Sequence, residues 1–208
     1  LFSAGLITGE VARLNNHELI RGQTVTLRGI TLNNHGQIAA DSSLTLQQQQ
    51  LTNHGLLDAA RFAISGQQLD NHGIIRQRGG TLAIKTGQLD NRGNIGLLPA
   101  DNPATGSGNG TSPAPGNDAA NSGAGGGSGS IELAGINNHN GAAILSAGQT
   151  DLSVNQQQLI NHGKMQLGTF HYSGDALDNY GQIRARRGEL SGKTLTNREG
   201  AVLSAGDF

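Results

Sequence analysis

A short motif, Leu-x-Asn-x-Gly, recurs nine times in this 208-residue chain, with some variation at the glycine. Its asparagines are Asn16, Asn34, Asn53, Asn71, Asn91, Asn138, Asn161, Asn179 and Asn197. Successive asparagines are 18, 19, 18, 20, 47, 23, 18 and 18 residues apart. A short fixed period of this kind is typical of a solenoid, in which one repeat cannot bury its apolar face alone and stacks on its neighbours. The longest spacing corresponds to one ordinary repeat plus an insertion.

Three positions in each repeat define the expected coil. The residue two positions before the asparagine is always Leu or Ile: Leu14, Leu32, Leu51, Leu69, Leu89, Ile136, Leu159, Leu177 and Leu195. This uniformity predicts a column of core side chains. Stacked asparagines can each donate to one neighbouring coil and accept from the other, so they predict a structural ladder. The glycine that usually follows predicts a tight turn with positive φ.

Short alternating apolar pairs, such as Val25 with Leu27 and Leu44 with Leu46, predict β-strands rather than helices. We therefore expect an all-β fold, a right-handed parallel β-helix (solenoid) of about nine coils of 18–23 residues. A left-handed β-helix is the alternative, because the shortest coils equal three hexapeptides. Its strict hexapeptide rhythm is absent, and variable turns with the usual handedness of parallel crossovers favour the right-handed form.

Residues 99–130 interrupt the repeat. They contain all four prolines and no apolar residue larger than alanine, so they cannot bury enough surface to offset the entropy of ordering them. We expect a flexible loop inserted in one coil, between coils at residues 1–98 and coils at 131–208 that continue the same solenoid. Residues 1–5 have the same phase as residues 202–206. Neighbouring coils of a longer chain are therefore expected at both ends.

Composition excludes several classes of function. Only 35% of the residues are hydrophobic and 3% aromatic, which suits a thin solenoid core better than a deep globular one. The net charge of −1 gives no electrostatic reason to expect nucleic acid or an anionic membrane as a partner. Cysteine is absent, which removes disulfides and thiolate chemistry. No segment is apolar enough for membrane insertion, and no cofactor motif is recognisable: the glycine run 125–127 lacks the Lys-Ser/Thr of a phosphate loop.

The position after each asparagine forms a second column. Its residues are His17, His35, His54, His72, Arg92, His139, His162, Tyr180 and Arg198. Four consecutive histidines suggest transition-metal binding, but a flat row offers at most two ligands to one ion, whereas metal sites need converging ligands. We therefore expect exposed turn residues that stack on one another, and no metal site.

Charged residues raise two further hypotheses. Asp70 and Asp90 precede the asparagine in adjacent coils, and paired carboxylates on one β-helix face could cleave polysaccharides. The other repeats carry Asn, Thr or Ile at this position, so we expect neither a cleft nor catalysis. Arginines at 76 and 78, and at 184, 186 and 187, share a phase and could contact sulfated glycans; solvated turn arginines are the alternative.

The segments Leu-Asp-Asn-His-Gly (69–73), Leu-Asp-Asn-Arg-Gly (89–93) and Leu-Asp-Asn-Tyr-Gly (177–181), at this period, resemble the haemagglutinin repeats of filamentous haemagglutinin. Similar repeats form the shafts of contact-dependent growth-inhibition exoproteins. The resemblance covers the chain except residues 99–130. It implies a right-handed β-helix in a secreted bacterial surface filament, exported by the two-partner route through a dedicated outer-membrane transporter.

The expected function is that of a non-enzymatic shaft segment in a secreted or cell-surface adhesin or contact-dependent inhibition filament. The first alternative is a section of such a filament that itself binds a host glycan or a target-cell receptor. The second is a β-helix polysaccharide hydrolase or lyase, which the absence of Trp and the presence of only two Tyr disfavour.

Overall fold

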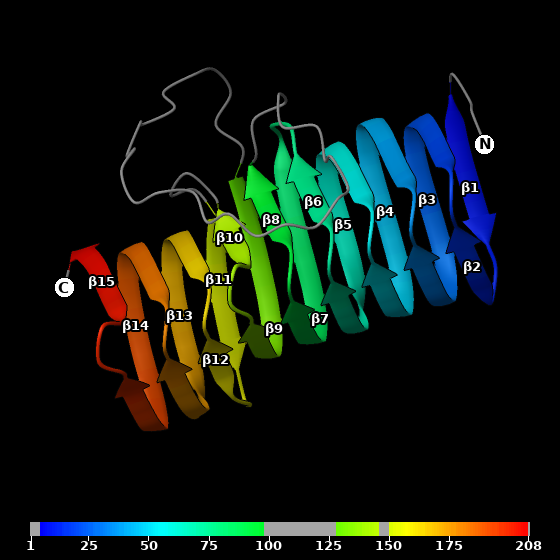
Figure 1. Ribbon diagram of the computed structural model, residues 1–208. Coiled ribbons are helices and arrows are strands. Elements are labelled where there is room, and N and C mark those ends of the chain that lie inside the picture. Colours follow the sequence, from blue (N-terminus) through cyan, green and yellow to red (C-terminus); the bar gives the residue numbers. More distant parts are fainter. Residues whose placement is uncertain (1–4, 98–127, 146–149, 208) are drawn as a thin grey trace.

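The computed structural model of the chain describes residues 5–97, 128–145 and 150–207. Over these residues the protein is a single rod of stacked β-strands with no helix (Figure 1). All strand pairs are parallel, and the chain winds through about nine turns. The predicted all-β parallel solenoid is therefore confirmed.

Fifteen strands make up the rod. They are β1 (Leu6–Glu10), β2 (Arg13–Asn16), β3 (Leu19–Asn34), β4 (Gln37–Asn53), β5 (Leu56–Asn71), β6 (Ile74–Gln77), β7 (Thr81–Asn91), β8 (Asn94–Leu97), β9 (Ser128–Asn138), β10 (Ala143–Leu145), β11 (Thr150–Asn155), β12 (Leu159–Asn161), β13 (Lys164–Asn179), β14 (Gln182–Asn197) and β15 (Val202–Asp207). The long strands bend around the coil and end at the motif asparagine, where the turn to the next coil begins.

The register of the strands follows the sequence motif. Leu32 lies opposite Leu51 between β3 and β4, and Leu51 lies opposite Leu69 between β4 and β5. Asn91 pairs with Asn138 across the insertion, so the repeat resumes in phase.

The strand β9 begins at Ser128, which pairs with Thr81. Residues 128–130 therefore belong to the sheet, and the predicted insertion boundary at 130 was three residues too late; residues 98–127 lie outside the described residues.

One corner of the coil absorbs the variation in repeat length. In β4 the register against β3 and β5 shifts between Ala40 and Ser43, which accommodates the one extra residue of this repeat. In the next longer repeat β6 and β7 are separated at the same corner by Gly79 and Gly80, both with positive φ. The strands β8 and β9, which end at Leu97 and begin at Ser128, flank the same corner, where neighbouring coils already tolerate extra residues.

The core is a narrow column of aliphatic side chains. The predicted core residues from Leu32 to Leu177 are buried, with at most 3% of any side chain exposed, and the alternating pairs pack beside them. Leu14 is only partly buried, and Leu195 is 50% exposed, so the prediction of burial is wrong for Leu195. Each coil is covered by its neighbours, and β15 pairs with β14 only over residues 182–187, which leaves Leu195 uncovered.

The motif glycines are required for a reason other than the one expected. Gly36, Gly55, Gly73 and Gly93 do not have positive φ. A Cβ atom built on Gly55 would instead lie 1.9 Å from the carbonyl oxygen of Gly36 in the preceding coil. Close stacking of the turns, not a left-handed backbone, excludes side chains there. The two glycines that stand three residues after the asparagine, Gly141 and Gly200, do have positive φ.

Candidate functional site

The nine motif asparagines form a continuous ladder inside the rod. Each of the first eight donates its Nδ2–H to the Oδ1 atom of the next, over 2.7–2.9 Å. Asn34 also donates to the carbonyl oxygens of Gly36 and Leu56, at 3.2 and 3.3 Å. The amides from Asn34 to Asn179 are fully buried. A buried amide left without partners is costly, so this ladder fixes the coil-to-coil register.

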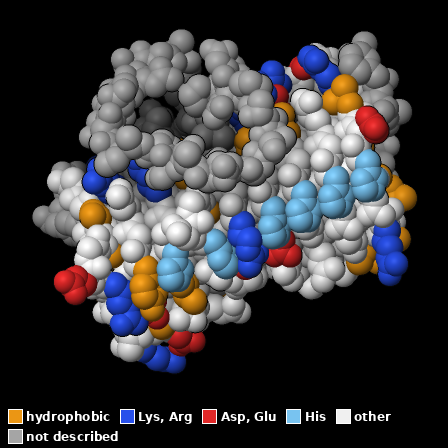
Figure 2. All heavy atoms as spheres, in the orientation of Figure 1, with side chains coloured by type: hydrophobic (Ala, Val, Ile, Leu, Met, Phe, Trp, Pro, Cys, Tyr) orange, Lys and Arg blue, Asp and Glu red, His pale blue; other side chains and the backbone are white. Residues whose placement is uncertain are grey.

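The residues that follow the asparagines form an exposed column of planar side chains on the surface. His17, His35, His54 and His72 stack with ring centroids 5.0, 4.8 and 4.6 Å apart. His162 stacks on Tyr180 at 4.3 Å, and the guanidinium of Arg198 lies 5.0 Å from the Tyr180 ring centroid. Figure 2 shows the first four histidines as a straight row along the rod.

The stacked geometry does not suit a metal ion. The first two pairs of rings are within 6° of parallel, and the lone pairs of an imidazole lie in the plane of its ring. Lone pairs in parallel planes cannot converge on one ion, and the ring spacing exceeds twice a Zn–N bond of about 2.1 Å. Among the described residues, no group of three or more His, Cys, Asp or Glu side chains could hold a metal ion.

The two carboxylates considered for catalysis are adjacent but already engaged. Asp70 and Asp90 occupy equivalent positions in β5 and β7. Asp70 accepts a bifurcated hydrogen bond from the Gln68 side-chain amide, with both carboxylate oxygens 3.0 Å from Nε2. Asp90 contacts the guanidinium of Arg92, and its Oδ1 lies 3.1 Å from Nε2 of His139. Each carboxylate therefore has partners that hold it on the surface instead of presenting it to a substrate.

The first arginine group forms a half-buried ion-pair cluster that the sequence analysis did not find. Asp58 in β5, whose side chain is 9% exposed, lies 2.8 Å from Arg76 and 3.1 Å from Arg78. Arg78 also donates to the carbonyl oxygen of Ala40 at 2.7 Å. The hydrogen bond to Asp58 raises the pKa of Arg76 further, against the opposing effect of its burial. The 18-residue separation of Asp58 and Arg76 equals one coil, a signal that could have revealed the pair.

The second arginine group is different. Arg184, Arg186 and Arg187 in β14 are exposed, and none has an ion pair or hydrogen bond to a residue whose side chain the structure describes. They have the same phase as Arg76 and Arg78, but in the preceding coil no acidic residue stands in the place of Asp58. In the following coil Asp207 is in register with Arg187. Their register partners in β13 are Gln166 for Arg184 and Thr169 for Arg187.

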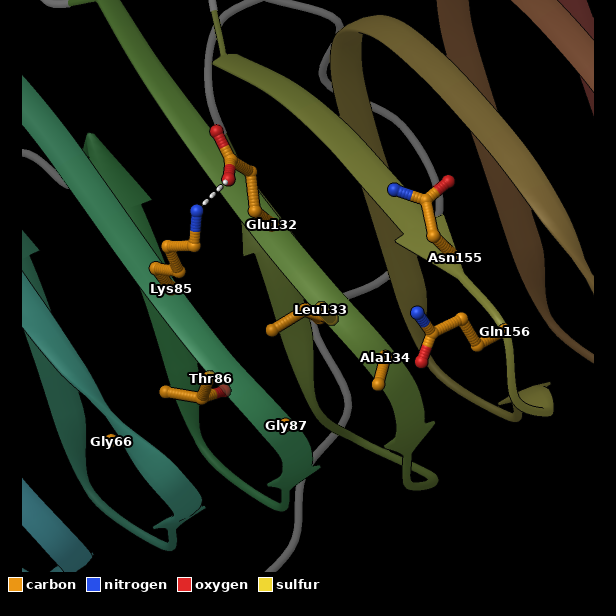
Figure 3. A pocket seen from close by; sticks show the side chains of 9 residues that line it. All are labelled: Gly66, Lys85, Thr86, Gly87, Glu132, Leu133, Ala134, Asn155 and Gln156. Atoms are coloured by element: carbon orange, nitrogen blue, oxygen red, sulfur yellow. Dashed lines mark ion pairs between the residues drawn. The ribbon is translucent and has the colours of Figure 1, made fainter.

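A shallow groove crosses four coils on another face (Figure 3). It has a volume of about 380 Å³ and a floor of small residues, Gly66, Gly87 and Ala134. The ion pair between Lys85 and Glu132, 3.1 Å apart, borders one side. Gln156 borders the other end of the groove. Its φ is 98°, and it is the one non-glycine residue with positive φ among the described residues. No motif in the sequence marks this groove, because its shape results from small residues in successive coils.

The chain matches no protein-family model, no curated protein and no solved structure. The functional proposal therefore draws on the architecture, the surface chemistry and the resemblance of the repeats. In the part of the chain that the structure describes, no helix could cross a lipid bilayer.

Proposed function

We propose that this chain is a shaft segment of a large secreted bacterial surface filament, an adhesin or a contact-dependent inhibition protein. Its role is to extend a functional region away from the cell, and it is not an enzyme. The proposal follows the resemblance of the Leu-x-Asn-x-Gly repeats to those of filamentous haemagglutinin. It includes export through an outer-membrane two-partner transporter and location at the cell surface or outside the cell.

The uninterrupted asparagine ladder is the observation that carries the proposal. Eight successive amide hydrogen bonds join coils on both sides of the insertion without a break. The strands of such a rod resist slipping past one another, because a shift of one residue would turn every core side chain outward. Such a rod can be lengthened by adding coils without changing its cross-section, which is what a spacer needs.

Removal of one whole coil from the full-length parent filament tests the proposal. Deleting residues 51–68 joins Gln50 to Leu69, which takes the place of Leu51 in the register. The variant should be exported and should bind or deliver to target cells as the parent does. The control deletion, residues 51–59, removes half a coil and should prevent folding. If the whole-coil variant folds but loses target-cell binding, the segment is itself a binding section and the spacer proposal is wrong.

A further inference from the structure

The turn that follows Asn138 is one residue longer than most of the motif turns. The Ala142 N–H at its end donates to the carbonyl oxygen of His139 at 3.1 Å, and Gly141 inside the turn has a φ of 79°. A hydrogen-bonded turn with positive φ at its third residue is of type II, which favours glycine at that position. The residue before the glycine is Asn140, which is exposed. The longer turn therefore presents an asparagine–glycine pair on the surface.

Hydrogen bonds do not hold either half of this pair. In the part of the chain that the structure describes, neither the side-chain amide of Asn140 nor the Gly141 N–H has a hydrogen-bond partner. A Cβ atom built on Gly141 would meet no atom within 4 Å, so the space beside this peptide is open. The peptide plane between the two residues is therefore free to rotate and to bring the Gly141 nitrogen against the side-chain carbon Cγ of Asn140.

We propose that Asn140 is a modification site, at which the side-chain amide is lost by spontaneous deamidation with water as the co-reactant. The Gly141 nitrogen gives its proton to solvent and forms a bond to Cγ of Asn140. The bond from Cγ to the amide nitrogen breaks, and that nitrogen takes up a proton and leaves as ammonia. Water then opens the cyclic succinimide at one of its two carbonyl carbons, which yields aspartate or isoaspartate. The modification does not depend on the proposed role of the rod as a spacer.

The motif asparagines are protected from this reaction in two ways. Their side-chain amides are held in the ladder: Asn138 donates to Asn161 at 2.7 Å and accepts from Asn91 at 2.8 Å. The residue after each of them is His, Arg or Tyr, whose side chain hinders attack by its own backbone nitrogen. Asn140 is thus the one described asparagine that precedes a glycine; Asn109 also does so but lies outside the described residues.

Conversion to isoaspartate changes the contact between this turn and the next coil. A Cβ atom on Gly163 would lie 2.2 Å from the carbonyl oxygen of Ala142 and 2.6 Å from that of His139, so the two turns are already in close contact. The Lys164 N–H at the start of β13 donates to the carbonyl oxygen of Ala142 at 3.0 Å. Isoaspartate carries the main chain through its side chain and so lengthens the turn. The hydrogen bond from Lys164 should therefore weaken, while the surface gains a carboxylate.

The last motif turn provides a matched test. Its Ala201 N–H donates to the carbonyl oxygen of Arg198 at 3.0 Å, and its Gly200 has a φ of 78°. The residue before this glycine is Glu199, which is exposed. Glu199→Asn therefore installs the asparagine–glycine pair in an equivalent turn. Asn140→Glu removes the pair from the first turn and replaces it with a residue that this turn geometry accepts.

Peptide mapping by mass spectrometry after incubation at mildly alkaline pH tests the proposal, with fragmentation that separates aspartate from isoaspartate. In the native chain the Asn140 peptide should convert at least about tenfold faster than any peptide with a motif asparagine. Asn140→Glu should lose this conversion, and Glu199→Asn should gain a second site of similar rate. Gly141→Asn, which tolerates positive φ but adds a Cβ atom, should slow conversion by about tenfold.

The comparison of peptides within the native chain needs no variant and is decisive. If the Asn140 peptide converts no faster than the motif peptides, the proposal is wrong. A folded Glu199→Asn chain without a second site would also overturn it, because the two turns have the same geometry. Hydrogen exchange at the Lys164 amide should become faster in the converted chain, and unchanged exchange would contradict the predicted loosening of the turn.

Discussion

Replacing Asn34 with alanine should destabilise the rod far more than replacing its neighbour Asn33. Both asparagines form an amide-to-amide hydrogen bond with an adjacent coil. Asn34 donates to Asn53 at 2.8 Å inside the rod, and Asn33 donates to Asn15 at 2.9 Å on its surface. Residue type, coil and bond length are thus matched, and the two sites differ in burial and in the further hydrogen bonds that Asn34 makes to Asn16, Gly36 and Leu56.

The magnitude follows from the partners that lose a bond. Without the Asn34 side chain, the fully buried Oδ1 of Asn53 loses its donor, at a cost of about 1–3 kcal/mol for an orphaned buried group. The lost hydrogen bond between Asn34 and Asn53 contributes about 1 kcal/mol more. Asn16 keeps its bonds to the carbonyls of Glu18 and Gln37, so its loss is small. We therefore expect Asn34→Ala to lose roughly 2–4 kcal/mol, and Asn33→Ala about 0.5 kcal/mol or less.

Urea denaturation followed by circular dichroism measures both losses, and hydrogen exchange of the backbone amides shows whether the change stays near the substituted coil. Asn34→Asp should be worse than Asn34→Ala, because it places a carboxylate against the carbonyls of Gly36 and Leu56. Similar losses for Asn33→Ala and Asn34→Ala would refute the reasoning, since the ladder would then be no more than a set of surface contacts.

Two further predictions concern groups that the ladder does not include. Asp58→Asn should lower the free energy of unfolding by several kcal/mol, because Asp58 is nearly buried between Arg76 and Arg78. Asp41→Asn breaks an exposed pair with Arg21 and should lower it by about 1 kcal/mol or less. Urea denaturation measures both losses. Burial, together with the nearby Asp175, raises the pKa of Tyr172 above its ordinary value of 10.0. As pH rises, the Tyr172 hydroxyl therefore ionises in the unfolded chain before it does in the folded one. The stability that Tyr172 contributes is complete at pH values below the unfolded pKa and declines as pH rises toward the folded pKa. Tyr172→Phe should weaken that alkaline decline in melting temperature, and an unchanged decline would contradict the assignment.

The repeat made most of the architecture predictable. Leu and Asn at fixed positions gave the register of every coil, because a parallel solenoid pairs each position with its equivalent one period away. The reason for the motif glycines was not predictable, because it depends on the distance between stacked turns and not on the local turn type. Asp58 was missed because it lies outside the motif, and the groove beside Gln156 results from small residues that carry no signature.

The functional surface was less predictable than the fold. In the sequence the two arginine groups have the same phase in their repeats, so the same role was predicted for both. The structure separates them, since Arg76 and Arg78 share Asp58, while Arg184, Arg186 and Arg187 pair with none of the carboxylates whose side chains are described. The difference depends on which residue stands one coil away, and a single motif does not encode it.

The length of the rod as a function of coil number is the most direct test of a spacer built from equivalent coils. Small-angle X-ray scattering of the native chain, a variant without residues 51–68 and a variant with that segment duplicated should give maximum dimensions that differ by about 4.8 Å per coil. The cross-sectional radius should stay constant across the series. A change in cross-section, or a length that does not follow coil number, would contradict the account.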